Sequence, residues 1–270
     1  MKQQRVGQSD LRMSPLGLGT VKIGRNQQVK YPTAFDLPDD AAVTALLHLA
    51  WELGINTLDT APAYGESERR LGELLPQRHD WVIIGKVGEQ FINGQSFFDF
   101  SAVATRQSVE ESLRRLRRDM LDVVLVHSDG NDMAIIREQA VCDTLLELKA
   151  EGKVKAVGMS TKSVAGGLWC VENMDLVMAS YHPDYQDELP VLDAAARLGK
   201  GVLIKKGLAS GHADRAAGGG GIEAALRLIF AHPAVASLVV GTINPDHLRQ
   251  NVALTEAILA AQGAVETRRK

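Results

Sequence analysis

The chain has 270 residues, of which 45% are hydrophobic and 23% are charged. This is enough apolar material for the core of one large domain. A formal net charge of −3 gives no electrostatic reason to expect nucleic acid or an anionic membrane as a partner, so we expect a small-molecule ligand.

The chain also lacks the usual signs of export and of domain division. Its first residues contain no apolar stretch of the signal-peptide kind, and no apolar run approaches the roughly 20 residues that cross a bilayer. Cys142 and Cys170 are the only cysteines, and we expect both to be reduced and buried. Together these features predict a cytoplasmic protein. Because the sequence contains no Pro/Ser-rich linker, we also predict that residues 1–270 form a single domain. No pattern predicts its oligomeric state.

The predicted elements begin with a short hairpin over residues 3–14, turning around Gly7 to Asp10. Eight short apolar runs follow, separated by amphipathic stretches: 16–21, 56–60, 81–86, 122–127, 155–160, 176–181, 201–206 and 237–242. Strands that are apolar on both faces and alternate with helices are typical of a parallel sheet. The pattern predicts an α/β fold, a (β/α)₈ TIM barrel with a short N-terminal hairpin. A doubly wound sheet is the alternative, and it is disfavoured because no GxGxxG follows the first run.

Helix boundaries are marked by capping residues. Asp39 or Asp40 can cap the helix that starts near residue 40, and Gly54 can take the left-handed position at its end. Gly152 and Gly199 suit the same role. Asn244 can cap the last helix, with Pro245 in its first turn.

Four residues with reactive side chains lie at the ends of apolar runs. Asp59, Lys86 and His127 each end a predicted strand, and Tyr64 follows Asp59 by five residues in a loop. Because the C-terminal ends of parallel barrel strands meet at one rim, we expect these side chains to share one pocket.

This set of groups suits proton transfer to a carbonyl. A tyrosine is a weak acid unless its phenolate is favoured, so we expect Lys86 to lower the pKa of Tyr64 while Asp59 holds Lys86 protonated. His127 would then orient the substrate oxygen. Each residue also has an ordinary structural explanation, since Tyr64 could pack in its loop, Lys86 could be solvated and Asp59 could cap the next helix. Their joint placement at strand ends favours catalysis.

These motifs resemble those of the aldo-keto reductase family. The matching stretches include LGLGTV (16–21), DTAPAYG (59–65), GK (85–86) and VLVH (124–127), in that order. The resemblance implies a (β/α)₈ barrel that reduces aldehydes or ketones to alcohols with NAD(P)H. It carries the family's catalytic tetrad onto Asp59, Tyr64, Lys86 and His127, and it implies a cofactor bound over the barrel mouth without a Rossmann domain.

The resemblance also implies a set of cofactor-binding positions, from which this chain departs in part. Ser160 is followed by Thr161 where the family commonly has Asn, Met178 replaces a Gln, and Lys205 replaces an aromatic residue. The implied positions are Gly19, Thr20, Val21, Asp59, Ser160, Thr161, Lys205, Lys206, Gly207, Leu208, Ser210, Gly241, Thr242, Ile243, His247, Gln250 and Asn251.

The choice between NADPH and NADH depends on cations near the adenosine 2′-phosphate. His247 and Gly241 stand where relatives commonly have Arg and Lys, and Arg249 is the nearby fixed charge. We expect NADPH, with NADH possible, and a weak preference that strengthens when histidine is protonated.

Two other functions remain open at this stage. The departures at Thr161, Met178 and Lys205 would suit a cofactor-binding regulatory or sensor protein with little turnover. A barrel with a strand-end lysine also suits a Schiff-base aldolase acting through Lys86, although Asp59 would keep that amine protonated. No metal is expected, because the histidines show no HxH or HExxH spacing.

Overall fold

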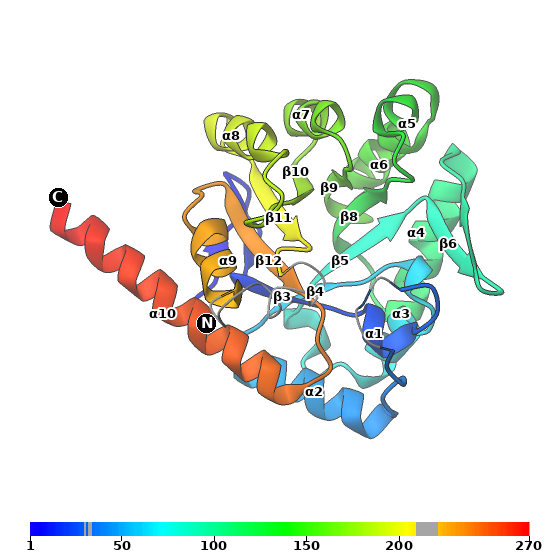
Figure 1. Cartoon of the computed structure of the whole chain (residues 1–270). Helices are drawn as coiled ribbons and strands as arrows, with labels where there is room; N and C mark the ends of the chain where they lie inside the picture. The colour runs from blue at the N-terminus through cyan, green and yellow to red at the C-terminus, as the bar shows by residue number, and fades with distance from the viewer. Residues whose placement is uncertain (30, 32–33, 209–220, 270) are drawn as a thin grey trace.

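The computed structural model describes residues 1–29, 31, 34–208 and 221–269, and within them eight parallel strands close into a barrel (Figure 1). The (β/α)₈ prediction is therefore confirmed, with each strand within a few residues of its predicted bounds. The strands are β3 (Leu16–Gly19), β4 (Thr57–Asp59), β5 (Val82–Val87), β8 (Leu121–His127), β9 (Val154–Ser160), β10 (Leu176–Ser180), β11 (Gly201–Lys205) and β12 (Val235–Val240).

Helices surround the barrel and connect its strands (Figure 1). They are α1 (Val21–Gly24), α2 (Asp40–Glu52), α3 (Ser67–Leu74), α4 (Ala102–Leu116), α5 (Asp132–Glu138), α6 (Val141–Ala150), α7 (Val164–Asn173), α8 (Leu189–Leu198), α9 (Gly221–Phe230) and α10 (Pro245–Arg269), with 3₁₀ turns at η1 (Pro62–Tyr64) and η2 (Arg78–Asp80). Long α10 lies beside α2 and α9 on the outside of the barrel, and its last turns extend beyond it.

The predicted caps are present. The Asp39 side chain accepts a hydrogen bond of 2.7 Å from the Ala42 amide, and Gly54 ends the same region with φ of +77°. Asn244 Oδ1 accepts from the amides of Asp246 (2.8 Å) and His247 (3.3 Å). Each cap satisfies backbone groups that the helix leaves unpaired, which fixes where the helix begins or ends.

Alternate residues along the strands pack inward and outward. Val82, Ile84, Val123 and Leu125 belong to a buried cluster inside the barrel, whereas Ile83, Val124 and Val126 pack in a larger cluster that includes helix residues. Burial on both faces explains the near-continuous apolar runs in the sequence.

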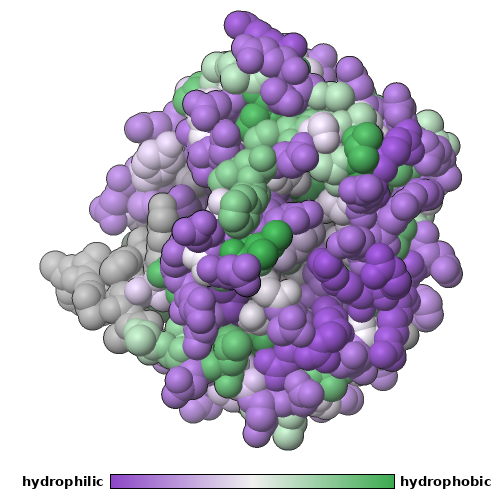
Figure 2. Space-filling view, turned by 90° about the vertical axis from the view of Figure 1, so that its right-hand side faces the viewer, coloured by the Kyte–Doolittle hydropathy of each residue, from purple (hydrophilic) through white to green (hydrophobic). Residues whose placement is uncertain are grey.

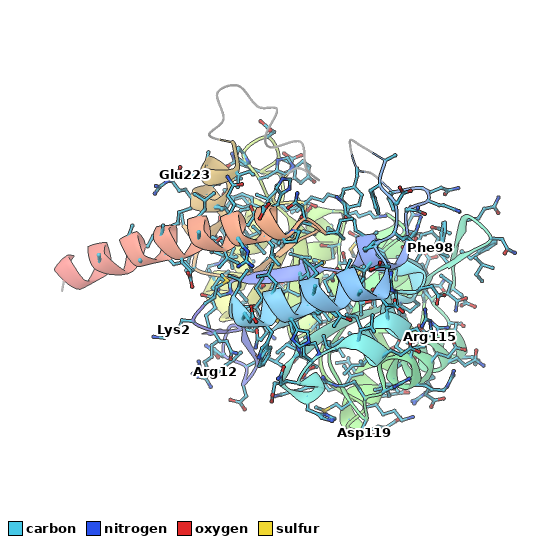
Figure 3. The ribbon with its side chains drawn as sticks, turned by 90° about the horizontal axis from the view of Figure 1, so that it is seen from below. Lys2, Arg12, Phe98, Arg115, Asp119 and Glu223 are labelled. Carbon is cyan, nitrogen blue, oxygen red and sulfur yellow. The ribbon has the colours of Figure 1, made fainter. Side chains whose placement is uncertain are left out.

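The predicted N-terminal hairpin closes one end of the barrel. Its strands are β1 (Gln4–Arg5) and β2 (Arg12–Met13), and fully buried Met13 packs in the interior cluster. The Gln4 side-chain amide donates to the carbonyl oxygens of Val235 (3.2 Å) and Ala236 (2.7 Å) at the start of β12. In Figure 3, Arg12 and Asp119, which both precede barrel strands, lie toward the lower end of the molecule, and Glu223 lies toward the upper end. A ligand must therefore enter from the other end.

A second hairpin follows β5 and was not predicted. Its antiparallel strands, β6 (Glu89–Ile92) and β7 (Gln95–Phe98), are joined by Asn93 and Gly94, which have φ of +50° and +81°. Positive φ at both central residues is typical of a type I′ turn, and Asn-Gly is its preferred sequence. Gly88, with φ of +100°, redirects the chain from the barrel into this hairpin.

The exterior and the cysteines agree with the composition. Figure 2 shows a face that is mainly hydrophilic, with hydrophobic residues in small separate groups. Cys142 and Cys170 are free and buried. Among the described residues, no helix combines the length and apolar character that a membrane span requires.

Candidate active site

A cavity of about 470 Å³ lies at the C-terminal ends of the barrel strands. Asp59, Tyr64, Lys86 and His127 all line it, so the structure brings together the four side chains that the sequence placed at strand ends. Asp59 and His127 are the last residues of β4 and β8, Lys86 is the next-to-last residue of β5, and Tyr64 ends the 3₁₀ turn η1 that follows β4. Convergence of parallel strands at one rim is what collects them.

Lys86 and Asp59 form a buried ion pair in this cavity. Lys86 Nζ lies 2.5 Å from Asp59 Oδ1 and also donates to the Thr60 carbonyl oxygen at 3.0 Å, and the two side chains are 2% and 6% exposed. Thr20 fixes the backbone beneath the pair, because its hydroxyl donates to the Asp59 carbonyl oxygen at 2.8 Å. A charge pair with these extra hydrogen bonds can be held in a low-dielectric site.

The Tyr64 hydroxyl lies beside the pair but is not acidified by it. It donates to Asp59 Oδ2 at 3.4 Å, and Lys86 Nζ lies 4.7 Å from the centre of the Tyr64 ring. Burial, followed by the Asp59 carboxylate, raises the pKa of Tyr64 well above its ordinary value. The expectation that Lys86 lowers this pKa is therefore wrong for the pocket as the structure has it, because Asp59 balances the ammonium charge and burial disfavours the phenolate.

His127 completes the cluster. Its ring meets that of Tyr64 edge to face, with centroids 6.2 Å apart, and its Nδ1 atom lies 2.8 Å from Glu89 Oε2 at the start of β6. Burial lowers the pKa of His127, the Glu89 carboxylate opposes that shift, and the Lys86 charge adds to it.

Most of the implied cofactor positions also reach the cavity wall: Gly19, Val21, Asp59, Ser160, Lys205, Lys206, Leu208, Gly241, Thr242, His247, Gln250 and Asn251. Met178 lines it as well, and Arg249 does not. The cavity therefore extends from the four candidate catalytic residues to the end of β12 and the first turns of α10.

Four of the implied positions do not line the cavity. Thr20 is buried and its hydroxyl bonds to Asp59 and Ser67. Thr161 is fully buried, Gly207 lies against Leu238 and Ile229, and Ile243 packs on the hydrophobic core. Ser210 lies outside the described residues.

Lys205 is the last residue of β11, lines the cavity and reaches the end of β9. Its ammonium donates to the Ser160 hydroxyl (2.9 Å) and to the Thr161 carbonyl oxygen (2.5 Å). Burial lowers its pKa to about 7, against the opposing charge of Glu188. The side chain therefore does not stack like the aromatic residue it replaces, and instead presents a titratable amine beside Ser160.

The donors along this cavity fit an anionic dinucleotide. The residues that line the cavity include Lys22, Lys162, Lys205, Lys206 and Ser160. Such groups bind phosphates and a carboxamide. Among the described residues, no cluster of three or more His, Cys, Asp or Glu suits a metal ion.

A sequence profile of the Aldo/keto reductase family matches residues 15–217. The chain belongs to this family. A solved aldo-keto reductase-type structure from Pseudomonas aeruginosa is 50% identical, covers 95% of each chain and superposes with a TM-score of 0.87. L-galactose dehydrogenase of Arabidopsis thaliana is 28% identical over 92% of this chain and 86% of its own length. NADH-specific methylglyoxal reductase of Escherichia coli is 31% identical over 58% of this chain and 51% of its own length. Family membership and these oxidoreductase relatives support nicotinamide-dependent carbonyl chemistry in general terms.

Some lining residues of this aldo-keto reductase were missed from the sequence. Tyr31 lies between Lys22, whose Nζ is 4.1 Å from the Tyr31 ring centre, and Gly241 across the cavity mouth. Tyr31 carries no sequence signal, because it lies between the predicted elements in a stretch without periodicity. Glu89, which contacts His127 and does not line the cavity, had a signal, because Asn93 and Gly94, four and five residues later, indicate a hairpin that returns the chain toward the strand end.

Proposed function

We propose that this protein reduces an aldehyde or ketone to an alcohol with NAD(P)H, using Tyr64 as the proton donor. The observation that carries the proposal is the shared cavity, in which the Tyr64 hydroxyl lies next to the buried pair of Lys86 and Asp59, with His127 beside it. The reactants of such a protein are a small carbonyl compound and the dinucleotide.

The chain's own residues account for the proton half of the reaction. When bound, the dihydronicotinamide supplies the hydride to the carbonyl carbon. Tyr64 then gives its proton to the developing alkoxide. Its raised pKa keeps the phenol protonated at neutral pH and makes it a weaker acid, so the transfer relies on the alkoxide being the stronger base. The ammonium of Lys86 lies 4.7 Å from the ring centre and attracts the phenolate that remains, and the neighbouring Asp59 carboxylate opposes that attraction.

Asp59 and His127 hold this arrangement in place. The carboxylate of Asp59 fixes the position of the Lys86 ammonium at 2.5 Å, and His127 lines the cavity where a substrate oxygen near Tyr64 would lie. Fixed groups of this kind stabilise charge without reorganising during the reaction.

The choice between NADPH and NADH depends on the residues at the end of the cavity formed by β12 and the first turns of α10. His247 and Gly241 line the wall there, and Arg249 does not. Since fixed cations are what distinguish a 2′-phosphate, both NADPH and NADH should bind, with a weak preference for NADPH. The NADH-specific relative from Escherichia coli shows that proteins similar to this one include NADH users.

A panel of aldehydes and ketones tests the proposal, with cofactor absorbance recorded for NADPH and NADH side by side. Tyr64→Phe should lose most reductase activity and keep its cofactor affinity, because the phenol acts on the substrate oxygen in the transition state. Tyr185→Phe, which changes a tyrosine away from the cavity, is the matched control. Near-normal reduction by Tyr64→Phe would contradict the proposal, and cofactor binding without turnover of any carbonyl would favour a sensor.

A further inference from the structure

The carboxylate of Glu89 contacts the imidazole of His127. Glu89 begins β6, and its Oε2 atom lies 2.8 Å from His127 Nδ1, while its Oε1 accepts a 2.6 Å hydrogen bond from the Ser96 hydroxyl on β7. The Glu89 side chain is 13% exposed and does not line the cavity. Glu89 therefore contacts the imidazole and not the space for substrate.

The second hairpin, formed by β6 and β7, positions this carboxylate. Gly88, with φ of +100°, turns the chain at the end of β5, and the pairing of Glu89 with Phe98 fixes the first residue of β6. Burial raises the pKa of Glu89, and His127 and the Ser96 hydroxyl lower it by more. The Arg25 guanidinium, which lies 3.4 Å from the centre of the Phe91 ring, lowers this pKa further. The net pKa of Glu89 is about 2, so it is a carboxylate at neutral pH.

The short contact constrains where the imidazole proton lies. The oxygen lies out of line with the ring N–H direction, so the 2.8 Å contact does not have hydrogen-bond geometry, and it acts through the attraction between the carboxylate charge and a proton on Nδ1. If Nδ1 carried no proton, the Glu89 carboxylate would lie 2.8 Å from an electron-rich nitrogen with no hydrogen between them. The contact is attractive only when Nδ1 carries the proton, because a carboxylate can only accept.

This position of the proton changes what His127 offers to a substrate. A neutral ring protonated on Nδ1 has an unprotonated Nε2, which accepts a hydrogen bond from an alcohol but gives none to a carbonyl oxygen. When Nδ1 keeps its proton, Nε2 can donate a hydrogen bond only if the ring is doubly protonated and therefore charged. Glu89 favours that charged form, and burial, Lys86 and Lys205 disfavour it. Uncharged Tyr64 meets the ring edge on.

We propose that Glu89 is a positioning residue that fixes a proton on Nδ1 of His127, which makes His127 a donor to the substrate oxygen only when its ring is charged. The inference rests on the proposed carbonyl reduction. Lower pH then favours reduction of the carbonyl, and higher pH favours binding and oxidation of the alcohol.

Glu89→Gln tests the inference, because an amide of the same shape can donate to Nδ1 and let a neutral ring keep its proton on Nε2. In the wild type, kcat/KM for reduction should fall roughly tenfold per pH unit above the His127 titration. In Glu89→Gln that fall should disappear or move. Glu110→Gln, an exposed change far from the cavity that breaks the ion pair with Lys153, should behave as the wild type.

Nitrogen NMR of the His127 ring gives a readout that needs no turnover. The wild type should show the neutral ring protonated on Nδ1, and Glu89→Gln should show it protonated on Nε2. A wild-type ring protonated on Nε2, or an unchanged ring in Glu89→Gln, overturns the inference. Absence of turnover with every carbonyl overturns the proposed function instead, and the spectrum then decides the inference alone.

Discussion

Replacing Lys86 with methionine should destabilise the fold far more than the loss of one hydrogen bond. Methionine keeps most of the side-chain volume but leaves the Asp59 carboxylate, which is 6% exposed, without its ammonium partner at 2.5 Å. The remaining hydrogen bond to that carboxylate from a described side chain would be from Tyr64, at 3.4 Å.

The size of the effect follows from the burial of the pair. Breaking a buried ion pair on one side costs about 3–5 kcal/mol, because the surviving charge is left uncompensated. For a protein of this size, each kcal/mol lowers Tm by roughly 2–4 °C, so Lys86→Met should lower it by about 6–20 °C. Asp59→Asn should act similarly, since it leaves the ammonium with the Thr60 carbonyl at 3.0 Å.

A double-mutant cycle measured by reversible urea unfolding separates charge from packing. The variant carrying both Lys86→Met and Asp59→Asn has no unpaired charge, so it should be more stable than the sum of the single effects predicts, by about 1–3 kcal/mol. Additive losses, or a loss below about 1 kcal/mol in Lys86→Met, would refute the claim that the pair is buried and mutually dependent.

Two further predictions concern His247 and Lys205, which both line the cavity. His247→Arg should raise NADPH affinity with little change for NADH, because a fixed guanidinium can bind the 2′-phosphate, and fluorescence titration of both cofactors measures this. Lys205→Met should flatten the pH dependence of stability: with the pKa of Lys205 near 7 in the fold and about 10.5 in the unfolded chain, the unfolded state binds more protons in this window, and wild-type stability rises with pH across it. Urea midpoints at about pH 7 and about pH 9 check this, and equal slopes in both proteins would contradict it.

The sequence predicted the barrel well because its signals were local. Runs such as residues 122–127 are apolar on both faces, and capping residues such as Asp39 and Asn244 act within one helical turn, so neither needs knowledge of the fold. Placing Asp59, Lys86 and His127 in one cavity needed only the rule that parallel strands end together.

What the sequence did not predict depends on contacts across the fold. The pKa of Tyr64 rises because the barrel buries it beside Asp59, and the low pKa of Lys205 arises from burial between β9 and β11. The role of Glu89 depends on its hairpin folding back onto His127. The Asn93-Gly94 turn in that hairpin was readable, but the partner that Glu89 meets was not.

The bonds from Gln4 to the start of β12 have a consequence for synthesis of the chain. The two ends of these hydrogen bonds are 231 and 232 residues apart, and β3 likewise pairs with β12. At about 5–20 residues per second, a ribosome needs roughly 10–50 seconds between making one partner and the other. During that interval β3 has one edge unpaired, so the speed of translation sets how long this edge is open to chaperones or to another nascent chain.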